Sequence, residues 1–282
     1  MITLQNIRFG YSKKKILFEE LSLHLSPGHI YGLLGKNGVG KTTLLKIISG
    51  LSFPQSGTPM LFGKRAEFRY PDVLQRISFL TEELYCPHLT IDRLEKTFAV
   101  FYPKFSHEQF QNYLQEFEIE SSTDFLDKLS HGQQKKVWVS FYLATNTEIL
   151  LMDEPTNGMD IPSKSIFRRV LASAASEERL FLISTHQVRD LHSLIDAVIV
   201  LDRGEIILNE PNERITEKLT FRSLREDEPN PQAILYKEEG IRGTYLIEEN
   251  QTGEETPLDL ELLFNALMIN KQAIIQIFNP KN

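Results

Sequence analysis

Apolar and polar positions alternate along the first part of the chain. The apolar positions are Ile2, Leu4, Ile7 and Phe9, followed by Leu21, Leu23 and Leu25. A period of two is typical of strands that bury one face. Because a turn-like run at residues 12–15 separates the two segments, we predict two antiparallel strands and a β-rich lobe at the start of the chain.

Farther along, short apolar runs alternate with helical patterns. We predict strands at residues 30–34, 60–62, 77–80, 149–152 and 180–184, a closing hairpin at 198–201 and 206–208, and helices at 41–49, 132–144 and 163–174. Strands that alternate with helices indicate a parallel sheet covered on both faces.

A helical insert interrupts this order at about residues 83–145. The period changes to 3.6 at residues 90–117, which places Ile91, Leu94, Phe98 and Phe101 on one face. We expect the phenylalanines of the insert to build its core and one or two of them to line a groove for a helix of a partner. They are Phe98, Phe101, Phe105, Phe110 and Phe117.

Past residue 210 the chain becomes more acidic. Residues 211–282 carry 8 basic and 13 acidic side chains, whereas residues 1–210 carry 23 and 25, so the tail holds −5 of the net charge of −7. Apolar positions predict a hairpin at 235–236 and 244–247 and a helix at 258–268. We therefore predict two parts, a domain of residues 1–210 and a small acidic α+β appendage of residues 211–282.

Composition narrows the class of protein. With 41% hydrophobic and 24% charged residues, the chain is not a disordered or fibrous one. A net charge of −7 does not favour wholesale binding to nucleic acid, so we expect no nucleic-acid partner. Cys86 is the single cysteine, which excludes an internal disulfide. We expect a cytoplasmic protein, because no apolar run has the length of a membrane span and the first residues lack a signal-peptide pattern.

Residues 35–42, GKNGVGKT, fit the phosphate-binding P-loop pattern. They lie between a predicted strand and a predicted helix, as the pattern requires. Glycines at 35, 38 and 40 let backbone N–H groups surround a phosphate at a helix N-terminus. Lys41 can then reach the β and γ phosphates, and Thr42 can ligate magnesium.

Two carboxylates, Asp153 and Glu154, end the apolar run at residues 149–152. This arrangement places one acid on magnesium and the next beside a water that attacks the γ-phosphate. Acids at a strand end are also often merely solvated, so the pair by itself leaves both interpretations open.

A third motif is the segment LSHGQ at residues 129–133, in which Ser130 lies 23 residues ahead of Asp153. Together with DEPT at 153–156, it resembles the signature of the ATP-binding subunit of an ABC transporter. The resemblance covers residues 1–210 and extends to a D-loop at 158–160, a switch histidine at His186 and an aromatic residue at Tyr11. It implies an α/β P-loop ATPase fold with an antiparallel β lobe, a parallel-sheet core and a helical insert. The tail is similar to the appendages of the drug and antibiotic exporter branch.

The resemblance also implies a role for each matching residue. Catalysis would involve Glu154, which polarises water, together with His186, Lys41 and Glu82. ATP would be bound by Tyr11 at the adenine, by Gly35, Asn37, Gly38, Gly40, Lys41, Thr42 and Thr43, and by Ser130, Gly132, Gln133 and Asp160 of a second subunit. Mg²⁺ would be held by Thr42, Asp153 and Glu82. Three of these residues have plainer interpretations, with Tyr11 as a strand aromatic, His186 as a structural histidine and Asp160 as a helix N-cap.

Two positions depart from the family pattern. Glu82 stands where the family usually has glutamine, and it adds a negative charge beside Asp153 and Glu154 that can alter carboxylate pKa values or metal affinity. His131 stands where the signature often has glycine.

The resemblance implies an ATPase that works with other chains. We expect a head-to-tail dimer with a second copy or a similar subunit, and a separate transmembrane permease that docks near residues 82–105. The chain would then be peripheral on the inner face of the cell membrane, and the tail favours export. Two alternatives are a soluble ABC ATPase acting on ribosomes or DNA, and a weakly hydrolysing regulatory subunit with an altered Glu82 loop.

Overall fold

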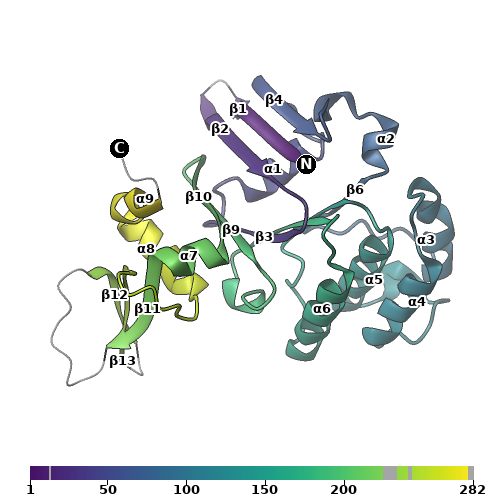
Figure 1. Cartoon of the computed structure of the whole chain (residues 1–282). Coiled ribbons are helices and arrows are strands. Elements are labelled where there is room, and N and C mark those ends of the chain that lie inside the picture. The colour runs from purple at the N-terminus through teal and green to yellow at the C-terminus, as the bar shows by residue number, and fades with distance from the viewer. Residues whose placement is uncertain (13, 225–233, 241–242, 279–282) are drawn as a thin grey trace.

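Three β-sheets organise the part of the chain described by the computed structural model, which is residues 1–12, 14–224, 234–240 and 243–278 (Figure 1). The antiparallel β lobe has the strand order β2-β1-β4-β5. Its strands are β1 (Ile2–Ser12), β2 (Lys15–Leu25), β4 (Ser56–Leu61) and β5 (Lys64–Arg65). The two strands predicted from the alternating pattern are confirmed, and they pair antiparallel as expected.

The central sheet has the order β10-β9-β3-β8-β7-β6, with β10 antiparallel to β9 and the other neighbours parallel. Its strands are β3 (His29–Leu34), β6 (Ile77–Leu80), β7 (Ile149–Asp153), β8 (Leu180–Thr185), β9 (Ala197–Asp202) and β10 (Glu205–Pro211). All residues of β7 and β8 are buried, which is why these strands read as continuous apolar runs. The predicted parallel sheet and closing hairpin are confirmed.

Two apolar layers cover the faces of the central sheet. One layer joins Leu151 and Leu182 to the β lobe and to α1 (Lys41–Ile48). The other joins Leu150 and Ile183, the next positions along the same strands, to α5 (His131–Ala144) and α6 (Ile161–Ala174). Shorter elements are η1 (Ala66–Phe68), α2 (Pro71–Leu74), η3 (Leu126–Lys128) and η4 (Val188–Asp190).

The helical insert is not one continuous helix. It contains α3 (Ile91–Phe98), η2 (Ala99–Phe101) and α4 (His107–Glu116). The helical period ends before Pro103, which lacks a backbone N–H and cannot continue a helix interior. The predictions that Phe101 lies on the buried face and builds the core are therefore wrong, because it is 61% exposed, whereas Phe110 and Phe117 are fully buried.

The tail forms a third sheet and three helices in its described part. Its elements are α7 (Asn212–Lys218), β11 (Leu219–Leu224), β12 (Ile234–Gly240), β13 (Gly243–Glu249), α8 (Leu260–Ile269) and α9 (Lys271–Phe278). The predicted hairpin and helix correspond to β12, β13 and α8, whereas α7, β11 and α9 were not predicted. Figure 1 places the tail and the helical insert at opposite ends of the molecule, with the central sheet between them.

None of the helices in these described ranges has the length and apolar character needed to cross a lipid bilayer.

Candidate nucleotide-binding site

The glycine-rich loop connects β3 to α1 and has a backbone that only glycine adopts easily. Gly38 and Gly40 have φ values of 79° and 115°, in the left-handed region. A β-carbon on Gly40 would lie 2.9 Å from the ring of Phe18, so the position excludes any larger residue. The loop therefore presents its backbone at the N-terminus of α1, where N–H groups and the helix dipole favour an anion.

Lys41, at the start of α1, is buried beneath this loop with 7% of its surface exposed. Its Nζ donates hydrogen bonds to the carbonyl oxygens of Gly35, at 2.9 Å, and Lys36, at 3.4 Å. It lies 3.9 Å from Glu154 Oε1. Burial lowers the pKa of Lys41, whereas the nearby carboxylates favour its charged form. The ammonium is thus held in place as a cation for an incoming phosphate.

Asp153 lies at the carboxyl end of β7 and is 1% exposed. One of its oxygens accepts a hydrogen bond from Thr42 Oγ1 at 2.6 Å, and the other accepts one from the hydroxyl of Ser184 at the end of β8. A hydroxyl and a carboxylate are hard oxygen ligands of the kind that Mg²⁺ takes alongside substrate phosphates. The residues present therefore fit this metal.

Glu154, the next residue, is 5% exposed and has a left-handed backbone, with φ of 45°. Its Oε1 lies 2.8 Å from Nδ1 of His186, which follows β8. Its Oε2 is buried and has no hydrogen-bond partner within the described part of the chain. Since an unpaired buried acceptor costs about 1–3 kcal/mol, this oxygen is suited to bind a water or a ligand.

These groups line one cavity of about 460 Å³. The predicted site residues that line it are Tyr11, Glu82, Asp153, Glu154, His186 and the P-loop positions 37, 38 and 40–43. Lys15 and Leu17 of β2 also line it and were not predicted, because only the β1–β2 pairing brings them beside Tyr11.

Tyr11 stands at the edge of this cavity and is 66% exposed. Its hydroxyl lies 2.5 Å from Thr43 Oγ1, and its ring packs edge-on against Phe9 with centroids 5.3 Å apart. The open ring face has the geometry that a base needs for stacking.

Glu82 follows β6 and projects toward the same cavity. Its Oε1 accepts a hydrogen bond from Asn157 Nδ2 at 3.1 Å. Its backbone carbonyl accepts one from Lys135 Nζ at 3.3 Å. The sequence pattern singled out neither Asn157 nor Lys135.

The signature segment and Asp160 lie outside the cavity. Ser130 caps α5, accepting from the Gln133 backbone N–H at 3.3 Å while the Gln133 side chain accepts from the Ser130 N–H at 3.0 Å. Asp160 accepts from the Ser163 backbone N–H at 2.9 Å, so its interpretation as the N-cap of α6 is confirmed. Hydrogen bonds from the Ser163 side chain and from the Ser163 backbone N–H hold the pKa of the Asp160 carboxyl below its usual range. Ser130, Gln133 and Asp160 are all exposed, on the surface of the chain.

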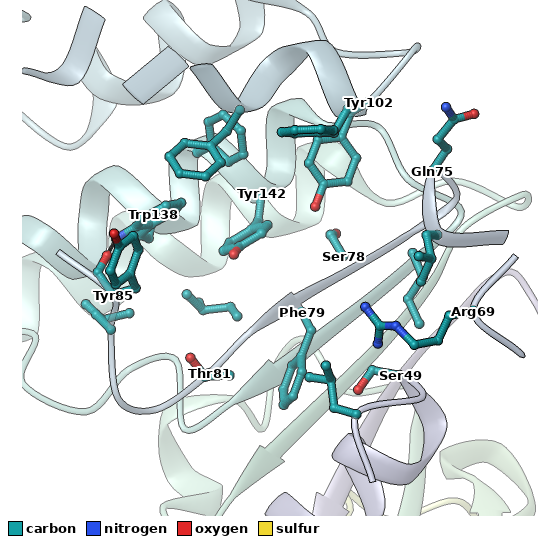
Figure 2. Close-up of a pocket in the computed structure, with 18 of the residues that line it drawn as sticks. Ser49, Arg69, Gln75, Ser78, Phe79, Thr81, Tyr85, Tyr102, Trp138 and Tyr142 are labelled. Carbon is teal, nitrogen blue, oxygen red and sulfur yellow. Dashed lines mark hydrogen bonds between the residues drawn. The ribbon is translucent and has the colours of Figure 1, made fainter. Parts of the chain in front are cut away.

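A second cavity, of about 530 Å³, lies beside the helical insert and is called the aromatic groove below. Figure 2 places Trp138 and Tyr142 of α5 on one side of it and Phe79 of β6 on the other. Exposed Phe101 of η2 also lines it. Arg69 carries the one full charge among the described residues that line the groove.

Taken together, the loop, the buried lysine and the hard oxygen ligands define a P-loop site for a nucleoside triphosphate. The family model described as ABC transporter matches residues 18–157. NatA of Bacillus subtilis, an ABC transporter ATP-binding protein, is 31% identical over 219 residues, covering 73% of this chain and 88% of NatA. Nod factor export ATP-binding protein I of Cupriavidus metallidurans is 29% identical over 225 residues, covering 78% of this chain and 74% of that protein.

The fold agrees with solved structures. A dimeric ATP-binding cassette in a post-hydrolysis state, bound to ADP and Pi, has a TM-score of 0.66 and 23% identity, covering 75% of this chain and 98% of that one. The chain belongs to the family of ABC transporter ATP-binding proteins. It is an ATPase, the ATP-binding subunit that powers an ABC transporter.

Proposed function

We propose that ATP with Mg²⁺ joins two copies of this chain head to tail, and that hydrolysis in the two shared sites drives export through a separate permease. One observation carries the proposal. The cavity of about 460 Å³ contains the P-loop and the carboxylates, whereas the signature residues lie on the surface outside it. A second chain that presents its own signature over the cavity completes each site.

Within the cavity, the P-loop amides and Lys41 hold the phosphates. Thr42, Asp153 and Glu82 would hold Mg²⁺, which would neutralise negative charge on the phosphates of ATP. Glu154 orients and polarises the attacking water through its unpaired buried Oε2. His186 contacts the γ-phosphate from the position where it already meets Glu154 Oε1.

The N-terminus of α5 supplies the partner's share of the site. Ser130 accepts the capping hydrogen bond from Gln133, so its own hydroxyl proton is available to a phosphate oxygen. Gly132 lies in the first turn of α5, where backbone N–H groups have no partner inside the helix. The helix dipole adds positive potential at the same point.

Light scattering of Glu154→Gln with ATP and Mg²⁺ tests the dimer. The variant binds ATP and does not turn it over, so we expect a stable species of twice the 32.5 kDa chain mass. Lys41→Ala is the matched control, because it loses nucleotide binding and stays monomeric. A monomeric Glu154→Gln at saturating ATP contradicts the proposal.

The aromatic groove receives a helix of the permease in this proposal. Trp138 Nε1 donates to the carbonyl of Tyr85 at 3.0 Å, which satisfies its polar edge, and its ring stacks on Tyr142 with centroids 5.5 Å apart, so this wall of the groove is apolar. Burial raises the pKa of Tyr142, so the groove stays uncharged there. The fitting occupant is an amphipathic helix with an acidic residue near Arg69.

Membrane sedimentation of the tagged chain from its native cell tests this docking. Phe101→Asp places a charge in the groove, so we expect it to move the chain from the membrane fraction to the supernatant. Ile269→Asp is the control, because Ile269 is 76% exposed on α8 and does not line the groove. Equal membrane fractions for both variants contradict the docking site.

Two further parts of the proposal concern direction and organisation. Export is supported by the similarity to the Nod factor export protein. The proposed permease partner would hold the chain at the inner face of the membrane. We place the boundary between the ATP-binding domain, residues 1–210, and the acidic appendage at residue 210. The appendage docks on the segment after the switch histidine, through an Arg189–Glu261 ion pair and a hydrogen bond of 2.5 Å between His192 Nε2 and the carbonyl of Leu258.

A further inference from the structure

Lys135 is a cation with no solvent exposure, on the inner face of the signature helix α5. Burial lowers its pKa, whereas Glu82, Asp153 and Glu154 favour its charged form. A buried ammonium is costly unless it is hydrogen-bonded. Its Nζ donates to the carbonyl oxygens of Glu82 and Glu154, each at 3.3 Å. One side chain therefore joins α5 to the loop that carries Glu82 and to the loop that carries Glu154, called the two acidic loops below.

The backbone of Glu154 needs such support. A left-handed conformation costs a residue other than glycine roughly 1–3 kcal/mol and persists only where surrounding contacts hold it. At Glu154, with φ of 45°, the N–H donates to the Ser184 carbonyl at 3.1 Å. Its carbonyl accepts from Asn157 N at 3.2 Å and from Lys135 Nζ. Of these three contacts, only the one from Lys135 comes from a helix, α5.

This backbone conformation decides where the Glu154 carboxylate lies. It directs Oε1 to His186 and to within 3.9 Å of Lys41 Nζ. Without Lys135, the Glu154 carbonyl keeps only the hydrogen bond of its own turn, and the peptide plane gains freedom to rotate. A displacement of about 1 Å in a catalytic group can lower a rate roughly 100-fold.

Charge gives a second reason for a lysine at this position. Glu82, Asp153 and Glu154 place three carboxylates on one cavity, and Lys41 faces them from the P-loop. Lys135 lies behind the acidic loops, where it offsets the additional charge that Glu82 brings.

We propose that Lys135 is a positioning residue for ATP hydrolysis, which holds the carbonyls of Glu82 and Glu154 and thereby fixes both carboxylates in the site. The inference rests on the proposed role of Glu154 as the group that polarises water. Lys135 itself does not line the cavity and touches no substrate.

Steady-state ATPase kinetics of three variants test this role. Lys135→Met keeps the length of the side chain and removes the donor together with a buried charge, so relief of the desolvation of the ammonium offsets the loss of its two hydrogen bonds. We expect kcat to fall roughly 10- to 100-fold, with KM for ATP within about threefold of wild type and an unchanged Tm. Lys135→Gln restores a neutral donor and should recover part of kcat. Lys136→Met is the matched control, because the neighbouring Lys136 donates a hydrogen bond to the Phe117 carbonyl and not to the carbonyl of Glu82 or Glu154, and it should keep wild-type kinetics.

Wild-type kcat in Lys135→Met overturns the inference. So does a fall in kcat that is matched by a fall in Tm, or an equal loss in Lys135→Met and Lys135→Gln. The kinetics of Glu154→Gln, measured in parallel, distinguish a failure of the role of Glu154 from a failure of the role of Lys135. If Glu154→Gln keeps its turnover, the role of Glu154 fails; if it is inactive while Lys135→Met is normal, only the role of Lys135 fails.

Discussion

Replacement of Lys41 by methionine removes the P-loop cation while keeping nearly the same side-chain volume. The ammonium lies in the cavity between the Gly35 and Lys36 carbonyls and the Glu154 carboxylate. Methionine cannot donate a hydrogen bond, and it leaves the carboxylates of the cavity to face a phosphate that is itself anionic. We therefore expect weak nucleotide binding from a folded protein.

The size of the effect follows from the geometry. A hydrogen bond between charged groups contributes about 1.5–3 kcal/mol net. At about 4 Å and an effective dielectric constant near 20, two unit charges interact by about 4 kcal/mol before desolvation is counted. Because Lys41 is nearly buried, solvent screens it little. We expect a loss of about 3–4 kcal/mol, which weakens the Kd for ATP roughly 100- to 1000-fold.

Isothermal titration with ATP and Mg²⁺ measures this Kd directly. Lys46→Met is the matched control, because Lys46 lies on the same helix but is exposed and does not line the cavity. It should bind ATP as the wild type does. A Kd for Lys41→Met within about threefold of the control would refute the reasoning, since phosphate would then be held without the cation.

Two further predictions concern the acidic loop and the insert. Glu82→Gln should keep or raise kcat, because the amide oxygen still accepts a hydrogen bond from Asn157 and the substitution removes one of three negative charges. Complete loss of ATPase activity would identify the carboxylate as a required ligand. Phe110→Ala should lower the free energy of unfolding by about 3–5 kcal/mol in urea denaturation, because its ring is fully buried against Phe105 and Phe141. Phe101→Ala, at an exposed ring, should change it by less than about 1 kcal/mol, and equal losses would contradict the assignment of Phe101 to the groove.

Local patterns predicted most of the fold of residues 1–210. The alternation around Leu21 and the apolar runs of β7 and β8 depend on neighbours in the chain, so periodicity reveals them. The helical period continues past Pro103 in the sequence, so periodicity alone does not reveal that the insert is broken there. β11 was not predicted because it is a short edge strand, and its pairing with β13 depends on a segment that is distant in the sequence.

The site was predictable where its residues belong to contiguous motifs. The P-loop and the Asp153–Glu154 pair each lie within a few residues of one another, and parallel strands bring them to one cavity. Ser184 and Lys135 act through packing between separate elements, and no spacing rule points to them. The placement of the signature outside the cavity was expected from the family resemblance, which assigns Ser130 and Gly132 to the site of a second subunit, and the structure shows it.

Mixing two inactive variants tests the shared site most directly. Lys41→Met disables the P-loop of a chain and leaves its signature intact. Ser130→Asp keeps an N-cap residue on α5 and sets a negative charge against the partner's phosphate. In a head-to-tail dimer of one chain of each kind, the intact P-loop of one meets the intact signature of the other.

We expect each variant alone to be inactive and an equal mixture to recover ATPase turnover, up to about a quarter of the wild-type rate if half of the dimers are mixed and each has one intact site. Turnover in the mixture that equals the sum of the separate variants would contradict the shared site, as would full activity of Ser130→Asp alone.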